Sequence, residues 1–240
     1  MEQILRLFPV RIRKCFLRAN IFEMFSGELE EVRVRVNQPI ELATARGAYF
    51  LKNDALVSVP DRQCLSATVE DLRQMSTLMS QYSLYAYEEE VRQGFLTVEG
   101  GHRIGVCGQV LQKAGTIGRI YPILYLNIRI ARERKGCGKV VYEQLWKHGE
   151  PENTLVLSAP GTGKTTLLRD LIRLFSNGDE MHPGKRIGLV DERSELAGCL
   201  HGIPQNDVGI RTDVLDGCPK VDGMMLLVRS MAPEILAVDE

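Results

Sequence analysis

The stretch that decides the fold is TLVLSAPGTGKTT, residues 154–166. Residues 154–157 have the composition of a buried strand, and apolar residues recur at helical spacing from Leu167 to Phe175. Glycines 161 and 163 let the intervening backbone curl so that its amide groups converge. The order strand, glycine-rich loop, helix therefore predicts a phosphate-binding loop at a helix amino terminus.

Nine residues form this loop and are expected to contact a nucleotide: Ser158, Ala159, Pro160, Gly161, Thr162, Gly163, Lys164, Thr165 and Thr166. We expect Lys164 to bind the β- and γ-phosphates of ATP and to act in catalysis, and the Thr165 hydroxyl to ligate Mg²⁺. The pattern GxxxxGK[ST] has glycine where this chain has Ser158. Serine is small enough to close the loop, so the assignment holds.

Two later apolar runs, residues 187–190 and 235–238, are each followed by an aspartate and then a glutamate. Both runs are predicted to be strands. Ligands of open α/β sheets bind at the carboxyl ends of the strands, so both acidic pairs are candidates for the nucleotide site.

The order of the two pairs suggests their roles. In P-loop ATPases with a catalytic glutamate, a strand later than the first one after the loop helix carries the Walker B acids. We therefore assign Asp239 to the Mg²⁺ shell, through water, and Glu240 to polarising the attacking water. Glu192 is the second catalytic candidate, in an acidic box with Asp191 that is expected to face the γ-phosphate.

The first 131 residues have a different pattern. Apolar residues at helical spacing between Ile4 and Phe16 are interrupted by Pro9, and Thr68 with Asp71 predicts a helix start. Alternating apolar residues predict strands at 32–36, 40–50 around Gly47, 95–98, 103–110 and 124–130, with a turn at Gly100-Gly101 that joins the third and fourth. A second helix is expected at 85–92. This pattern predicts a compact α+β domain with an antiparallel sheet.

The predicted organisation is therefore an α+β N-terminal domain at 1–131, a charged, glycine-rich linker at 132–139 and a P-loop domain at 140–240. Strands alternating with helices in the last segment predict a parallel sheet. The P-loop domain is expected to be incomplete, because the sequence stops at Glu240, directly after its Walker B strand. We interpret the sequence as a fragment; the alternative is a product that binds nucleotide without hydrolysis.

Composition excludes several classes of protein. The formal net charge of −1 gives no global attraction to nucleic acid or anionic lipid. Six cysteines occur without metal-ligand spacing, which favours reduced thiols in the cytoplasm. Apolar runs long enough to span a bilayer are absent from the sequence.

Several runs together resemble a known family: residues 82–109, 155–166, 190–195, 211–218 and 229–240. They are similar to the stage III sporulation protein AA family, a relative of the type II and type IV secretion ATPases. The resemblance implies a RecA-like ATPase that binds ATP and Mg²⁺ and forms a homo-oligomeric, hexamer-like ring. It also implies a cytoplasmic protein, peripheral at the membrane through other stage III channel proteins, that powers the channel from mother cell to forespore.

An arginine that stabilises developing charge is common in phosphoryl transfer. The candidate arginine fingers are Arg211, which lies in a family-like run, and Arg132, at the start of the expected linker.

A second hypothesis is an ATP-dependent nucleic-acid-binding protein with a KH-like N-terminal domain. Its signals are two GxxG spacings, 105–108 and 115–118, and the basic strand positions Arg33 and Arg35. GxxG is a weak pattern and neither loop has a basic interior, so nucleic acid is not an expected partner. A third hypothesis is the non-hydrolysing, nucleotide-gated scaffold.

Overall fold

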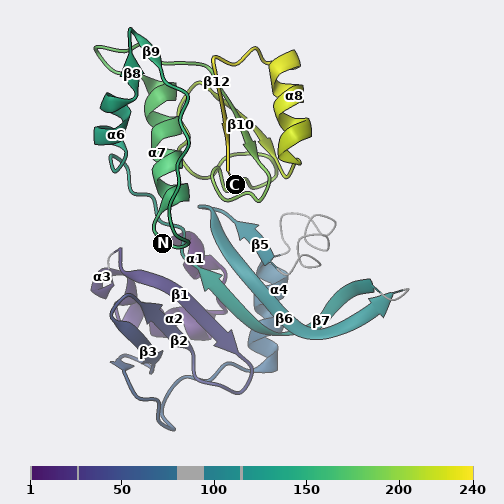
Figure 1. The fold of residues 1–240 in the computed structure, drawn as a ribbon. Coiled ribbons are helices and arrows are strands. Elements are labelled where there is room, and N and C mark those ends of the chain that lie inside the picture. Colours follow the sequence, from purple (N-terminus) through teal and green to yellow (C-terminus); the bar gives the residue numbers. More distant parts are fainter. Residues whose placement is uncertain (1, 26, 80–94, 114–115, 240) are drawn as a thin grey trace. The chain divides into compact units, whose positions relative to one another are not determined.

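The computed structural model describes residues 2–25, 27–79, 95–113 and 116–239 (Figure 1). The chain divides into two compact units, Met1–Arg132 and Glu133–Glu240. The helix expected at 85–92 lies outside the described residues. Among the helices that are described, none combines the length and apolar character needed to cross a bilayer.

Within the described part of the first unit, the strands form a seven-stranded sheet in the order β4-β3-β2-β1-β7-β6-β5, with every neighbour antiparallel. The strands are β1 (Leu29–Arg35), β2 (Glu41–Thr44), β3 (Gly47–Leu51), β4 (Leu56–Val57), β5 (Phe95–Val98), β6 (His102–Lys113) and β7 (Thr116–Arg129). The expected antiparallel sheet is confirmed. So is the hairpin at Gly100-Gly101, where Val98 pairs with His102.

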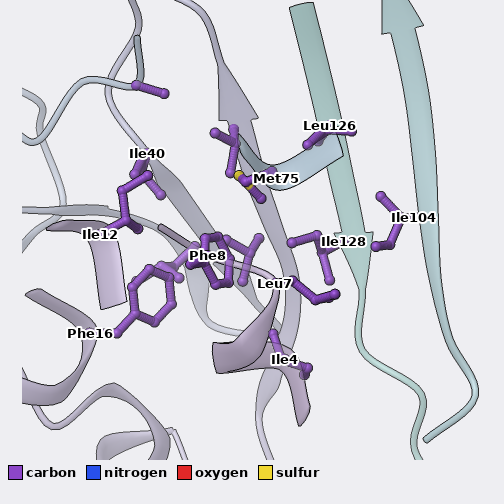
Figure 2. Close-up of a cluster of buried hydrophobic side chains, with 14 of the residues drawn as sticks. Ile4, Leu7, Phe8, Ile12, Phe16, Ile40, Met75, Ile104, Leu126 and Ile128 are labelled. Atoms are coloured by element: carbon purple, nitrogen blue, oxygen red, sulfur yellow. The ribbon is translucent and has the colours of Figure 1, made fainter. Parts of the chain in front are cut away.

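Helices α1 (Glu2–Arg6), α2 (Val10–Arg18) and α3 (Ile21–Met24) precede this sheet. Pro9 separates α1 from α2 and is the N-cap of α2, as its missing amide predicts. Figure 2 shows how side chains of these helices meet those of the sheet in one buried cluster. The rings of Phe8 and Phe16 stack with centroids 4.8 Å apart.

Helix α4 (Val69–Met79) begins at the predicted cap. The Asp71 amide donates to Thr68 Oγ1 at 3.1 Å, and the Thr68 amide donates to Asp71 Oδ2 at 2.7 Å. Arg11 of α2 also donates to the Asp71 carboxylate. Burial raises the pKa of Asp71, but the hydrogen bonds from Arg11 and Thr68 outweigh it and lower the pKa below the ordinary value.

In the second unit three of the described strands form a parallel sheet in the order β11-β10-β12, and β8 pairs with β9 antiparallel. The elements of this unit are α6 (Lys139–Gln144), β8 (Trp146–Lys147), β9 (Glu150–Pro151), α7 (Lys164–Asn177), β10 (Ile187–Asp191), β11 (Thr212–Asp216), α8 (Lys220–Ser230) and β12 (Ile235–Val238). The parallel sheet and the strands at both acidic pairs are confirmed.

The two long helices cover opposite faces of the central strand β10. Ile187 and Leu189 belong to the buried cluster that contains the apolar residues of α7. Gly188 points to the other face, where it lies against Leu227 of α8. Because successive strand residues face opposite sides, α7 and α8 sandwich the sheet.

The strand expected at 154–157, before the phosphate-binding loop, is wrong. These residues have no strand pairing, and Leu155 and Leu157 are each 80% exposed. The segment instead borders a cavity of about 750 Å³ that β12 and α7 line from the other side. A strand forms only against a hydrogen-bonding neighbour, and β12 pairs here with β10 alone among the described strands.

Four side-chain rings of the second unit, those of Tyr142, Trp146, Phe175 and His182, pack together. Trp146 stacks on His182 with centroids 4.1 Å apart, and Tyr142 packs edge-on against both Trp146 and Phe175 of α7. Burial raises the pKa of Tyr142 to about 12. The cluster fixes α6 and the β8-β9 hairpin against the helix that follows the loop.

Residues 133–138 of the expected linker fall within the second unit. The Gly138 amide donates to Asp170 Oδ2 on α7 at 2.8 Å, and Lys135 forms an ion pair with Asp207 at 2.6 Å. The first contact attaches the segment to α7, and the second attaches it to the loop before β11.

Candidate functional site

The loop predicted to bind phosphate ends where α7 begins. Gly163, with φ of 100°, is the N-cap, and Gly161 also has a positive φ of 75°, a region that favours glycine. The Leu167 amide donates to the Gly163 carbonyl at 2.9 Å, which starts the helix. The amides before it, at residues 164–166, have no carbonyl within the helix to bond. They and the helix dipole favour an anion at this position.

Ser158, at the position where the pattern has glycine, is joined to the loop by its side chain. The Thr162 hydroxyl lies 2.6 Å from Ser158 Oγ and 2.7 Å from the Ala159 carbonyl oxygen. All three residues are exposed. The serine therefore contributes a hydrogen bond across the mouth of the loop.

The loop helix and the end of β12 meet directly. Thr165 Oγ1 donates to Asp239 Oδ2 at 3.2 Å. Lys164 and Asp239 both line the 750 Å³ cavity. Hydroxyl and carboxylate oxygens are the ligands that Mg²⁺ prefers, so this pair fits a magnesium ion held beside a bound triphosphate.

A smaller cavity of about 120 Å³ lies at the acidic edge of the sheet. The residues that line it are Asp191, Glu192, Arg193, Glu195, Lys220 and Asp239. Lys220 Nζ lies 3.9 Å from Glu192 Oε2. The structure thus brings Glu192 and Asp239, two of the predicted site residues, to one cavity.

Asp191 has a structural role that the sequence did not predict. It is 1% exposed, and its carboxylate accepts the amides of Glu195, Leu196 and Ala197 at 2.9, 3.0 and 2.8 Å. Both oxygens are committed to the chain's own backbone. Asp191 shapes the loop after β10, and Glu192 is the member of the pair whose side chain is partly exposed.

The sequence analysis missed Asp216, which is paired with Asp191 across β10 and β11. Burial raises the pKa of Asp216, and the neighbouring Asp191 charge acts in the same direction. The Ser194 hydroxyl donates to this carboxylate. Burial also raises the pKa of Cys199, whose thiol contacts Asp216, to about 12. The family-like runs 190–195 and 211–218 contain Asp191, Ser194 and Asp216, but the sequence does not show that these side chains meet.

The two candidate arginine fingers lie elsewhere. Arg211 donates to the Ser176 carbonyl at 3.0 Å and the Asn177 carbonyl at 3.3 Å, at the end of α7 opposite the loop. Arg132 lies in the first unit, 3.6 Å from Glu30. Within the chain, Arg211 therefore caps the loop helix and does not reach Lys164. Glu240 lies outside the described residues.

The GxxG segment at 105–108 is not a clamp loop. Gly105 and Gly108 lie in β6, where they pair with Asn127 and Ile123 of β7. A KH module needs such glycines in an open loop between helices, so the KH-like reading of this segment is wrong. Residues 116–118 of the second spacing belong to β7.

A family model described as sporulation stage III, protein AA, matches residues 1–240. The chain belongs to this family. Stage III sporulation protein AA of Bacillus subtilis (strain 168) is 40% identical over 240 residues, which cover 100% of this chain and 73% of that relative. The family name implies a role in sporulation.

Solved ATPases share the fold. The ATPase DotB of Legionella pneumophila aligns over 97% of this chain with a TM-score of 0.51 and 15% identity. The pilus retraction motor PilT, solved with bound ADP, aligns over 93% with a TM-score of 0.52 and 13% identity. The chain spans 60% and 59% of their lengths. This sporulation family is therefore similar in structure to secretion ATPases.

Proposed function

We propose that this sporulation stage III AA chain binds ATP with Mg²⁺ and hydrolyses it, as the P-loop subunit of a secretion-type assembly. The observation that carries the proposal is the contact between Thr165, on the first turn of the loop helix, and Asp239, at the end of β12. This contact joins the phosphate-binding loop to a carboxylate at the strand edge where ligands bind.

The loop supplies the binding energy for the triphosphate. The amides at residues 164–166 and the helix dipole favour the β-phosphate, and the Lys164 ammonium adds a charge-assisted hydrogen bond. Thr165 and, through water, Asp239 would hold a magnesium ion, which would supply positive charge beside the phosphates. Residues 133–240 form the P-loop domain in this proposal.

For hydrolysis a carboxylate must orient the attacking water. We assign this role to Glu240, which follows Asp239, and keep Glu192, at the 120 Å³ cavity beside Asp239, as the second candidate. Comparing Glu240→Gln with Glu192→Gln distinguishes them: the variant that binds ATP normally but turns it over poorly identifies the base.

The likeness to DotB and PilT, together with the family's name, supports a ring of several copies that serves the channel from mother cell to forespore. In a ring, Arg211 or Arg132 would act on the nucleotide of a neighbouring copy. The partners would be other stage III channel proteins, reached at the cytoplasmic face of the membrane.

The test is the Lys164→Ala variant, with ATP affinity measured by titration calorimetry. Loss of a hydrogen bond to a charged group costs about 1.5–3 kcal/mol, which weakens binding roughly 10- to 150-fold. Lys139→Ala, which removes an exposed lysine from the start of α6, is the matched control and should bind ATP like the parent.

Equal ATP affinity of Lys164→Ala and the parent would refute the loop assignment. Phosphate release, measured on the parent with and without Mg²⁺, then separates two functions. Magnesium-dependent turnover supports the ATPase, whereas tight binding without turnover supports the non-hydrolysing scaffold.

A further inference from the structure

Arg169 of α7 reaches across to the loop that follows β10. Its Nε donates to the Leu196 carbonyl oxygen at 2.6 Å, and its Nη2 donates to the Glu195 carbonyl oxygen at 2.6 Å. Arg169 lies one helical turn after Thr165, on the same helix. The loop helix therefore contacts both halves of the acidic edge: Asp239 through Thr165, and residues 195–196 through Arg169.

The same peptide groups are held from the other side. Asp191 accepts the amides of residues 195–197, and Asn206 Nδ2 donates to the Leu196 carbonyl at 2.9 Å. The Ala197 carbonyl accepts the amides of Gln205 and Asn206 at 3.0 Å each. These hydrogen bonds hold the backbone of residues 195–197 in place, and Arg169 links it to α7.

The clamped segment continues directly from the residues that line the 120 Å³ cavity. Glu192 and Arg193 precede it, and Glu195 lines the cavity as well. Ser194 has a positive φ of 52°, uncommon for serine, so the chain turns sharply between the cavity and the clamp. A shift of residues 195–196 would therefore move Glu192 relative to Asp239.

We propose that Arg169 is a positioning residue that ties the loop helix to segment 192–197, so that Glu192 and Arg193 are set at a fixed place beside the nucleotide phosphates. The inference rests on the proposed ATPase function. In this role Arg169 acts through the two carbonyl groups that it bonds, those of Glu195 and Leu196.

An arginine suits this task better than a lysine. The planar guanidinium presents donors in a fixed fork, so one side chain bonds two adjacent carbonyls. Arg169 is half-buried, and burial lowers its pKa, whereas the carboxylates of Glu133, Asp191 and Asp239 act in the opposite direction. Its charge thus also offsets the repulsion among the acids of this edge.

The test compares Arg169→Gln, Arg169→Lys and a matched control, Arg173→Gln, in the chain as it exists. Arg173 lies one turn further along α7 and pairs with Asp170 at 2.7 Å, away from residues 195–196. ATP affinity and steady-state turnover are measured for each protein. Amide hydrogen exchange of residues 194–197 reports directly on the clamp.

We expect Arg169→Gln to leave the Kd of ATP within about twofold of the parent while kcat falls on the order of 10²-fold. The reason is that Glu192 and Arg193 would lose their alignment with the nucleotide phosphates. Exchange of the 194–197 amides should quicken by roughly tenfold or more. Arg169→Lys should fall between Arg169→Gln and the parent, and Arg173→Gln should match the parent in kcat and in exchange.

Unchanged kcat in Arg169→Gln, or unchanged exchange at 194–197, would overturn the proposal. So would a parallel loss of ATP affinity and kcat in both Arg169 variants, which would make Arg169 a binding residue. A parent that neither binds nor hydrolyses ATP overturns the proposed function instead, and the exchange measurement then still decides whether Arg169 holds the loop.

Discussion

Asp191→Asn changes one atom of a buried carboxylate that holds three backbone amides. One Asp191 oxygen accepts the Glu195 amide and the other accepts the amides of Leu196 and Ala197. Asparagine offers one acceptor oxygen and an NH₂ group. If its oxygen keeps the two amides, the NH₂ group faces the third amide, donor against donor.

The size of the effect follows from these contacts. Leaving one buried amide without a partner costs about 1–3 kcal/mol, and hydrogen bonds to a charged acceptor exceed neutral ones by roughly 1 kcal/mol each. Removing the Asp191 charge beside Asp216 relieves a repulsion that offsets part of this cost. We expect a net loss of about 2–3 kcal/mol in the free energy of unfolding of the second unit.

Scanning calorimetry measures the change as a shift of the second unit's thermal transition. At about 4–8 °C per kcal/mol for a unit of roughly this size, its Tm should fall by roughly 10–20 °C. Glu192→Gln is the control: it neutralises the adjacent carboxylate, whose ion pair with Lys220 is 3.9 Å long, and should shift Tm by a few degrees at most. Equal shifts for the two variants would refute the role given to Asp191.

Two further predictions concern Asp216 and the β6-β7 hairpin. Because burial raises the folded-state pKa of Asp216 above its ordinary 3.8, the folded chain holds this proton more tightly, and the free energy of unfolding should decline as pH rises through that window. Asp216→Asn should remove this slope in urea titrations from acid to neutral pH; an identical slope in both proteins would contradict it. Gly108→Ala would place a Cβ 2.1 Å from the Pro122 carbonyl oxygen, whereas Gly105→Ala meets nothing nearer than 3.8 Å. Gly108→Ala should therefore destabilise the first unit by about 1–3 kcal/mol in urea unfolding, with Gly105→Ala within about 0.5 kcal/mol of the parent, and equal stability of the two would disprove the close approach.

Local rules predicted the elements whose causes are local. Pro9 lacks an amide and separates two helices, and the Thr68–Asp71 pair satisfies the first amides of α4. The loop helix from Lys164 to Asn177 followed from apolar spacing and from the glycines at its two ends. In each case the interacting groups lie a few residues apart, so the sequence contains the whole interaction.

Features that depend on distant partners were beyond such rules. The apolar run 154–157 has strand composition, but strand formation needs a neighbouring strand, and composition does not supply one. The acidic pair at 191–192 indicated a site, yet the pattern does not show that Asp191 turns to the amides of 195–197. Arg169 has no motif at all, because its partners are carbonyl groups that every residue carries.

The stack of Trp146 on His182 has an optical consequence. The chain contains a single tryptophan, and its indole packs against Phe175 of the loop helix. Indole emission therefore reports on the second unit alone. The first unit has tyrosine but no tryptophan, so it does not contribute to the indole emission. The chain therefore carries an intrinsic fluorophore that reports on the second unit without any added label.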